Sequence, residues 1–171
     1  MKKILILALL LLALVGCEGK DNTIPNGLLP LTAVNDCDEP TLEGGWTCIW
    51  ADEFNGSEVD STKWNFEVNT SGGGNNELQS YTDRNAQVVD GKLVITAKRE
   101  SDSFKEYTSS RLTTKYKGTF QYVRIVVRAK MPTGRGTWPA IWMMPLMNVY
   151  GGWPDSGEID IAGFAMHSPK Q

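Results

Sequence analysis

Extended segments with a two-residue period recur along this chain, and this period constrains the fold more than any other feature of the sequence. Such alternation is typical of β-strands, and no long segment shows the 3.6-residue period of a helix. Asp90-Gly91 lies between two strand-like runs and predicts a tight hairpin. The sequence therefore predicts an all-β protein, an antiparallel β-sandwich with Gly-rich turns. The residues expected to share a face are Leu93, Ile95 and Ala97 in the hairpin, Val123, Ile125, Val127 and Ala129 within 119–131, and Trp138, Ala140, Trp142 and Met144 within 138–144.

The segment 157–161, Gly-Glu-Ile-Asp-Ile, points most directly to a chemistry. In a strand, Glu158 and Asp160 lie on one face, and Ile159 and Ile161 lie on the other. We expect the isoleucines to be buried in a core and the two acids to line a groove. Paired carboxylates in a groove are what cleavage of a glycosidic bond requires.

Simpler interpretations of these residues stay open at this point. Two acids on one strand face are most often part of a solvated surface. Three tryptophans, Trp138, Trp142 and Trp153, precede the acids, and indole rings stack well on the apolar faces of sugars. Each tryptophan alone is as readily a core residue, because most Trp side chains are largely buried.

Composition and charge argue against several functions. The chain has 171 residues, of which 41% are hydrophobic, and a formal net charge of -3. These values suit one soluble domain without a basic surface for nucleic acid. His167 is the only histidine, so we expect neither a His-dependent triad nor a multi-His metal site.

The N-terminal residues predict export. Lys2 and Lys3 precede an apolar run over 4–15, which is shorter than the roughly 20 residues of a membrane span and is typical of a secretory signal. The run ends in Leu-Val-Gly-Cys17, which resembles the lipobox of bacterial lipoproteins. We expect a lipid-modified Cys17 that anchors the exported protein to a bacterial membrane, at the cell surface or on the periplasmic side. The alternative is an ordinary signal peptide with an incidental cysteine.

The chain divides into three parts on composition. Residues 1–16 are the expected signal peptide, 17–44 form a polar spacer that contains Pro, Gly, Asn and Asp, and 45–171 carry the strand signals. Cys37 and Cys48 would pair in an exported protein and close a short loop ahead of the domain, with two unpaired thiols as the alternative.

Across roughly residues 46–161 the chain resembles glycoside hydrolase family 16, in particular its laminarinase (endo-1,3-β-glucanase) type. The order and spacing of many short blocks carry this resemblance. The blocks are Trp-Ala-Asp-Glu-Phe-Asn-Gly at 50–56, Trp-Asn-Phe-Glu at 64–67, Asn-Asn-Glu-Leu-Gln at 75–79 with Tyr-Thr at 81–82, Gly-Lys-Leu-Val-Ile-Thr-Ala at 91–97, Ser-Arg-Leu-Thr-Thr-Lys at 110–115, Gly-Thr-Trp-Pro-Ala-Ile-Trp-Met at 136–143, and Gly-Trp-Pro at 152–154 before Gly-Glu-Ile-Asp-Ile at 157–161.

The resemblance implies a fold, a mechanism and a set of site residues. The fold is a concanavalin A-like β-jelly-roll sandwich with an open cleft for a β-glucan. The mechanism is a retaining double displacement in which one Glu attacks the anomeric carbon and a second Glu serves as acid and then base. Glu158 matches the nucleophile, and Asp160 matches the Asp that assists it. The residues that match cleft positions are Asn76, Arg111, Trp138, Trp142 and Trp153.

Two departures from the family pattern limit what the resemblance implies. The second Glu falls at 163 in laminarinase-type members and at 162 in lichenase-type members, but this chain has Gly163 and Ala162. A complete sandwich of this kind runs about 200–250 residues, so we expect 45–171 to be the N-terminal part of a C-terminally truncated domain, with exposed strand edges and apolar faces.

Three hypotheses for function follow from these observations. The first is a retaining glycoside hydrolase for β-1,3-glucan or mixed β-1,3/1,4-glucan, impaired in this chain by the missing acid/base. The second is a lipid-anchored glycan-binding surface protein without catalysis, and the third is a fragment that does not fold. No cofactor is expected, and no ligand cluster in the sequence supports the structural calcium of some family members.

Overall fold

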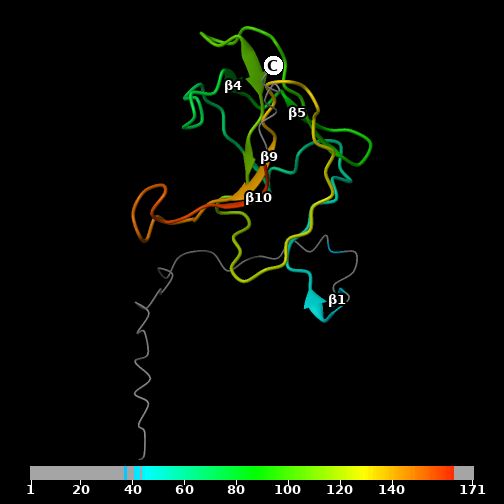
Figure 1. The fold of residues 1–171 in the computed structure, drawn as a ribbon. Coiled ribbons are helices and arrows are strands. Elements are labelled where there is room, and N and C mark those ends of the chain that lie inside the picture. The colour runs from blue at the N-terminus through cyan, green and yellow to red at the C-terminus, as the bar shows by residue number, and fades with distance from the viewer. Residues whose placement is uncertain (1–36, 38–40, 43, 164–171) are drawn as a thin grey trace, which may run out of the picture. The chain divides into compact units, whose positions relative to one another are not determined.

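The computed structural model describes residues 37, 41–42 and 44–163, and all regular structure in this part of the chain is β (Figure 1). The strands are short, from two to five residues. The predicted signal peptide, the lipidated Cys17 and His167 lie outside the described residues. The strands are β1 (Thr41–Leu42), β2 (Trp46–Thr47), β3 (Asn65–Phe66), β4 (Gln79–Tyr81), β5 (Ala86–Val88), β6 (Leu93–Ile95), β7 (Tyr107–Ser109), β8 (Leu112–Thr113), β9 (Ala140–Met143) and β10 (Ile159–Gly163).

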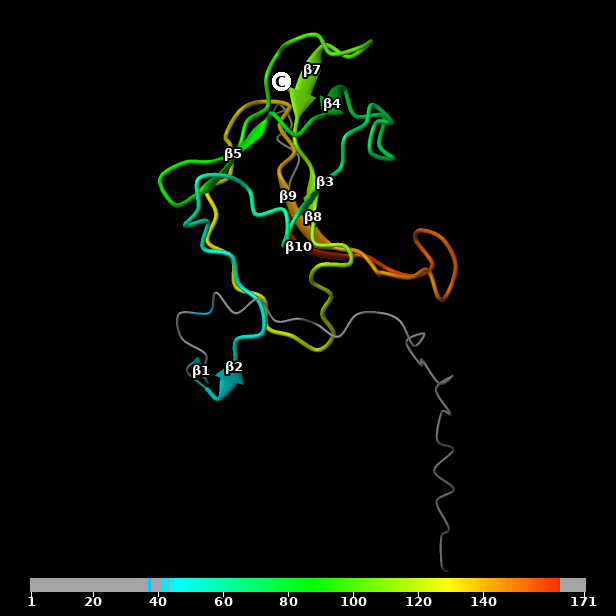
Figure 2. The ribbon, with the colours of Figure 1, turned by 180° about the vertical axis from the view of Figure 1, so that it is seen from behind.

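The described strands form two-stranded sheets, most of them antiparallel as predicted. The antiparallel pairs are β1–β2, β3–β8, β5–β6 and β9–β10. The pair β4–β7 is parallel, so the expectation of a purely antiparallel arrangement is wrong at this point (Figure 2). Between β4 and β7 the chain forms the β5–β6 hairpin. This long connection lets β7 run in the same direction as β4.

The predicted hairpin at Asp90-Gly91 is confirmed. Strands β5 and β6 pair in antiparallel register, with Val88 opposite Leu93. Asp90 and Gly91 have φ angles of 49° and 66°, the left-handed conformation that a tight type I′ turn requires at both central positions. Val89 and Lys92 exchange two backbone hydrogen bonds of 2.9 and 3.1 Å and close the turn.

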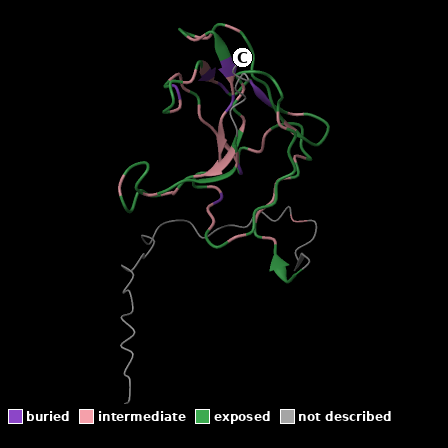
Figure 3. Cartoon of the chain, in the orientation of Figure 1, coloured by how far each residue is buried: buried purple, intermediate pink, exposed green. Residues whose placement is uncertain are grey.

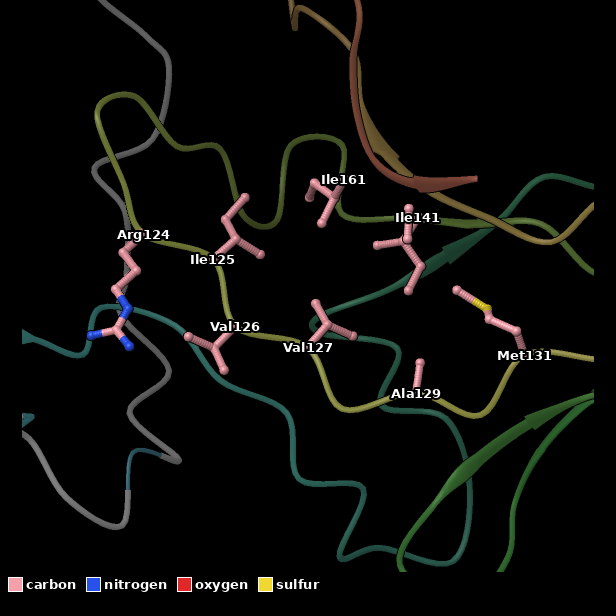
Figure 4. Close-up of a pocket in the computed structure, with 9 residues that line it drawn as sticks. Arg124, Ile125, Val126, Val127, Ala129, Met131, Ile141 and Ile161 are labelled. Carbon is pink, nitrogen blue, oxygen red and sulfur yellow. The ribbon is translucent and has the colours of Figure 1, made fainter. Parts of the chain in front are cut away.

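The predicted strand within 119–131 has no hydrogen-bonded partner among the described residues. The chain is nonetheless extended there, and its side chains alternate as the sequence predicts. Ile125, Val127 and Ala129 point toward a hollow that Ile141 of β9 and Ile161 of β10 line from the other side (Figure 4). Periodicity therefore identified the extended conformation, while pairing depends on a neighbour that the described residues do not supply.

The buried residues of the described chain are mainly polar, contrary to the aliphatic core that alternation suggests. Of the described hydrophobic residues only Ala86 is buried. Around β4 and β7 the buried segments gather, while the loop before β10 is exposed (Figure 3). We call this group the buried polar cluster. It consists of Ser80, Thr82, Asn85, Thr108 and Ser110.

Hydrogen bonds within the buried polar cluster satisfy its side chains. The amide of Asn85 donates to the carbonyl oxygen of Thr96 at 2.8 Å and to the hydroxyl of Thr108 at 2.9 Å. The Thr82 hydroxyl donates to the side-chain oxygen of Asn85, and the Ser110 hydroxyl donates to the carbonyl oxygen of Thr82. These bonds join the segment between β4 and β5 to β7, to Ser110 and to Thr96 after β6, so a polar network holds this region together.

The N-terminal part of the described chain is organised around Asp52. Its carboxylate accepts hydrogen bonds from the backbone N–H of Phe54 at 2.9 Å and from the indole N–H of Trp64 at 2.7 Å. Trp64 packs edge-on against Trp50, with ring centroids 5.5 Å apart. The predicted Cys37–Cys48 disulfide is present and lies just before this group.

Candidate active site

Strands β9 and β10 place Asp160, one of the two predicted catalytic acids, on one face of an antiparallel pair. Asp160 lies directly opposite Trp142, so their side chains share a face. The register shifts between Asp160 and Ala162, because Ile161 is the extra residue of a β-bulge. Beyond the bulge, Gly163 lies opposite Ala140 and returns to the face of Asp160 and Trp142. We call this side of the pair the acid face.

The other side of the β9–β10 pair is apolar. Ile161 and Ala162 line the hollow together with Ile141 and the extended segment from Arg124 to Met131 (Figure 4). This hollow therefore lies on the side of β10 opposite to the acid face. The expectation that both isoleucines are buried is wrong, since Ile159 is 62% exposed and Ile161 is 41% exposed. Burial in a sandwich needs a second layer over this face, and the segment 124–131 approaches it near Ile161.

Glu158 precedes β10 and is held by a tryptophan of the same loop. The indole N–H of Trp153 donates to Oε2 of Glu158 at 2.8 Å. Both side chains are exposed, so the carboxylate is oriented but remains open to a ligand. Two residues that the resemblance assigned to the site are thus in direct contact.

The loop that carries Trp153 is closed by Ser156. The hydroxyl of Ser156 donates to the carbonyl oxygen of Gly151 at 2.6 Å and accepts from the backbone N–H of Tyr150 at 3.1 Å. The backbone N–H of Gly157 donates to the carbonyl oxygen of Pro154 at 2.8 Å. These short-range bonds fix the loop on both sides of Trp153 and so define where its indole meets Glu158.

Arg111 contacts the acid face through Trp142. Its guanidinium carbon is 4.7 Å from the centroid of the Trp142 ring and 6.0 Å from that of Tyr81. Its Nε donates to Oε2 of Glu67 at 2.8 Å, in a partly exposed ion pair. A cation over an aromatic face is attracted by the ring quadrupole, so Arg111 ties Trp142 to residues of the β3 and β4 regions.

Sequence reasoning assigned no role to Glu67 or Tyr81, although both lie in the blocks that carry the family resemblance. The Tyr81 hydroxyl donates to Glu77, whose Oε2 also accepts from the amide of Gln79 at 3.0 Å. Burial first, and then the bond to the Glu77 carboxylate, raises the pKa of Tyr81 to about 12. The only signal was their place within the matched blocks, which does not reveal which side chains meet.

The remaining predicted site residues are not joined to this group by contacts. Trp138 lies just before β9 and is 59% exposed. Asn76 lies in the turn 72–77 with a φ of 55°, and its side chain is exposed. The structure therefore joins Glu158 to Trp153, and places Asp160 opposite Trp142 with Arg111 over the Trp142 ring, while the roles of all the predicted site residues stay predictions.

The position of the missing acid is open on the acid face. A Cβ placed on Gly163 would meet its nearest neighbours, the Ala140 side chain and the Pro139 carbonyl oxygen, at 3.7 and 3.8 Å. These are ordinary van der Waals distances, and both Gly163 and Ala140 are exposed. The bulge therefore gives position 163, and not 162, the direction that a carboxylate would need to face Asp160.

In the part of the chain that the structure describes, no helical segment has the length and apolar character of a membrane span. Across residues 37, 41–42 and 44–163, no group of three or more His, Cys, Asp or Glu side chains is arranged to hold a metal ion.

Comparison with known proteins identifies relatives over most of the described chain. The family model described as "XgeA-like, catalytic GH16 domain" matches residues 55–169. A glucan endo-1,3-beta-glucosidase of Cryptopygus antarcticus is 48% identical over 75% of this chain and 49% of its own length. A beta-glucanase of Rhodothermus marinus is 49% identical over 68% of this chain and 43% of its own length.

Solved structures agree with these sequence relatives. The laminarinase of Rhodothermus marinus superimposes with a TM-score of 0.68 at 48% identity, over 71% of this chain and 51% of that structure. The predicted all-β fold class, a sandwich of the jelly-roll type, is therefore confirmed. The chain spans about half the length of the relatives it matches.

Proposed function

The chain belongs to glycoside hydrolase family 16, and from this membership we propose that it is a retaining glycoside hydrolase directed at β-1,3-glucan or mixed β-1,3/1,4-glucan. Its similarity to endo-1,3-β-glucanases supports this substrate class. The observation that carries the proposal is the acid face. There Asp160 is paired with Trp142, and Glu158 is held by Trp153.

Each side chain of the acid face has a role in this proposal. The Glu158 carboxylate attacks the anomeric carbon and forms a glycosyl-enzyme, which water later hydrolyses. The Trp153 N–H orients one carboxylate oxygen so that the other is free for attack. Asp160 stabilises positive charge at the sugar ring, and the ring of Trp142 supplies an apolar platform for a sugar face.

The chain as it stands hydrolyses natural glucan poorly in this proposal. Positions 162 and 163 carry no carboxylate, so no family-type Glu protonates the leaving oxygen or activates water. General acid–base catalysis contributes about 10²–10⁴-fold in rate, and we expect a loss of that size relative to a complete site.

Restoring the acid tests this proposal. Gly163→Glu is expected to raise the rate of laminarin hydrolysis by about 10²-fold or more, because the bulge directs position 163 to the acid face. Gly163→Gln is the matched control with equal volume and no proton to give, and Ala162→Glu places a carboxylate toward the apolar hollow. Reducing-end assays measure the rates.

The pattern across the three variants decides the result. A gain with Gly163→Glu alone supports the proposal. Equal rates for Gly163→Glu and Gly163→Gln, with melting curves that show both variants folded, would contradict it. A gain with Ala162→Glu instead would mean that the register of β10 differs from the bulged one described above.

A non-catalytic glycan-binding role is the second candidate. The exposed indoles of Trp138 and Trp153 favour it, since both are open to solvent and Trp153 contacts Glu158. Binding of laminarin by affinity electrophoresis, unchanged in Glu158→Gln and lost in Trp153→Ala, together with no glycosyl-enzyme in the parent chain, would favour this role over hydrolysis.

We also propose that the protein is exported and anchored to a bacterial membrane through a lipid on Cys17. The support is the sequence Leu-Val-Gly-Cys at the end of a short apolar run. Metabolic labelling with an alkyne fatty acid in a bacterial host is expected to label the parent chain and not Cys17→Ser. Labelling that persists in Cys17→Ser would contradict the anchor.

A further inference from the structure

We propose that one side of the extended segment 122–130 binds the anionic headgroups of a lipid bilayer and so orients the domain on a membrane surface. This role goes beyond glucan hydrolysis and uses no residue of the acid face. It is also separate from the lipid proposed on Cys17, because an acyl anchor tethers a domain but does not determine which face meets the bilayer. The feature that carries the proposal is a row of exposed cations on this segment.

The charges of this chain are distributed unevenly, although its net charge is only -3. Residues 107–154 contain no Asp or Glu, but they contain seven of the 17 Lys and Arg residues. Three of these cations, Arg124, Arg128 and Lys130, are close together in the segment 122–130. A net charge describes the whole chain and not any one surface, so a positive surface is compatible with a chain that is acidic overall.

The three cations share one side of the segment with a valine. The segment is extended, so alternate residues lie on the same side. Figure 4 shows the side chains of Arg124 and Val126 on the opposite side of the segment from those of β9 and β10. Six residues of extended chain span about 20 Å, which is the length of this row. We call the row the outer stripe. It consists of Arg124, Val126, Arg128 and Lys130.

The cations of the outer stripe have no protein partner in the described part of the chain. Elsewhere, Arg84 forms ion pairs with two acids at 3.2 and 3.3 Å, and Lys117 donates to two backbone carbonyl oxygens at 2.6 Å. Within residues 37, 41–42 and 44–163, Arg124, Arg128 and Lys130 make no hydrogen bond, ion pair or contact with an aromatic ring. All three are exposed, so their charges are available to an external anion.

The apolar residues of this surface favour a lipid bilayer over a soluble polyanion. Val126 lies between the cations and is 73% exposed, and Tyr122, just before the outer stripe, is 94% exposed. A site that binds through charge alone gains nothing from these two side chains. At a membrane interface, Tyr rings lie at the headgroup level and apolar side chains reach the acyl boundary. The outer stripe therefore combines attraction to anionic headgroups with burial of apolar area.

The expected size of the effect follows from the number of cations. Each Lys or Arg near an anionic bilayer strengthens binding about fivefold, so the three cations contribute roughly a hundredfold. Salt screens exposed charges, so this contribution is expected to weaken as the ionic strength rises. An acyl chain and a basic patch together anchor a protein more firmly than either alone, so the outer stripe would act in concert with a lipid on Cys17.

The test measures binding of the full chain to vesicles by sedimentation. The vesicles contain phosphatidylcholine alone or a two-to-one mixture of phosphatidylcholine and phosphatidylglycerol. Every chain carries Cys17→Ser, so no acyl anchor contributes. The apolar run over 4–15 is common to all variants, and the vesicles of phosphatidylcholine measure its contribution. The parent chain is expected to prefer the mixed vesicles, and this preference should decline with added salt.

The first variant neutralises the outer stripe. Arg124→Gln/Arg128→Gln/Lys130→Gln is expected to weaken binding to the mixed vesicles by roughly a hundredfold and to leave binding to phosphatidylcholine unchanged. Arg124→Lys/Arg128→Lys keeps the charge and should keep the binding. Because these side chains are exposed, we expect the urea midpoint of each variant to equal that of the parent chain.

The matched control removes the same charge from another exposed surface. Arg84→Gln/Lys98→Gln/Arg99→Gln neutralises three cations of a region that also carries Glu100 and Asp102. Because those acids offset the cations, no positive surface is lost there. We expect binding to the mixed vesicles to change by less than about threefold.

A fluorescent label shows which surface meets the bilayer. With Cys17 replaced and Cys37 bonded to Cys48, an NBD group can be placed on Val126→Cys alone. Its emission is expected to shift to the blue on mixed vesicles, because the outer stripe enters the interface. Val149→Cys, which replaces an exposed valine outside the outer stripe, is the control and should shift less.

The outcomes decide the proposal without reference to hydrolysis. Loss of binding in the outer-stripe variant, with binding retained in the control, supports it. Equal binding of the two triple variants overturns it, as does a label on Val126→Cys that stays in water. Binding of dextran sulfate through the outer stripe, with none of the mixed vesicles, also overturns it and assigns the surface to a soluble polyanion. The proposed glycosidase activity stands or falls separately, because no residue of the acid face is changed.

Discussion

The buried polar cluster and the acid face belong to the same domain, but the polar side chains are buried and hydrogen-bonded in the first and exposed in the second. In the cluster, Asn85 and Thr108 are buried, and protein atoms satisfy their side chains. On the acid face, Glu158 is exposed and takes one indole N–H. Buried polar groups must be paired to be tolerated, whereas exposed carboxylates keep their reactivity toward a ligand. One region is therefore expected to control stability and the other to control chemistry.

The largest expected effect is on stability. Asn85→Ala removes the amide that bridges the Thr96 carbonyl oxygen and the Thr108 hydroxyl, and leaves buried groups without partners. We expect the free energy of unfolding to fall by about 2–4 kcal/mol. Gln87→Ala, on the exposed side of β5, is the control and should change it by less than about 0.5 kcal/mol. Urea denaturation followed by Trp fluorescence measures both, and equal effects would break the comparison.

A smaller effect is expected on chemistry alone. Trp153→Phe keeps an aromatic ring but removes the N–H that orients Glu158. We expect the rate of glycosyl-enzyme formation from an activated donor to fall about tenfold, which corresponds to one hydrogen bond to a charged group at an exposed site. The urea midpoint should stay unchanged. A rate equal to that of the parent chain would show that the indole does not position the carboxylate.

Arg111, which follows Ser110 of the buried polar cluster in sequence, contacts both Glu67 and the Trp142 ring of the acid face. Glu67→Gln weakens the ion pair that holds Arg111 over the Trp142 ring. Because the pair is partly exposed, we expect affinity for laminari-oligosaccharides to fall only about two- to fourfold. Arg84→Gln breaks another exposed ion pair, away from the acid face, and should leave affinity unchanged in isothermal titration calorimetry.

The smallest expected effect is a dependence of the free energy of unfolding on pH, caused by the buried Tyr81 hydroxyl and its hydrogen bond to Glu77. The folded pKa of Tyr81, about 12, is above the usual value of 10. Between pH 10 and 12 the unfolded chain releases this proton and the folded chain retains it, so stability falls as pH rises through this window. Tyr81→Phe should remove this part of the decline. Absorbance at 295 nm should show one tyrosine titrating late, and its absence would contradict the raised pKa.

Much of the local structure was predictable because it depends on residues close in sequence. Asp90-Gly91 gave the hairpin, since few residue pairs adopt its two left-handed positions. The alternation assigned Trp142 to one face of its segment and Asp160 to one face of its own, and the β9–β10 register joined the two faces. The resemblance pointed to position 163 or 162 for the second Glu, and the bulge at Ile161 turns position 163 to the acid face.

The contacts that make a site were not predictable from the pattern. The parallel pairing of β4 with β7, the Arg111 contact with Trp142 and the bond from Trp153 to Glu158 all depend on where the chain returns in space. The exposure of Ile159 was not predictable either, because periodicity assigns a side chain to a face of the strand but does not show whether another layer covers that face.

The sequence by itself determined which residues alternate, where the chain turns, and that Glu158 and Asp160 stand without a carboxylate at 162 or 163. Only the tertiary structure decided that Gly163 returns to the acid face while Ala162 turns to the hollow, and that Glu158 is oriented by an indole. The physical reason is the separation in sequence over which the two kinds of interaction act. Backbone conformation follows from sterics between neighbours in the chain, whereas register and side-chain contacts are set by partners that folding brings together.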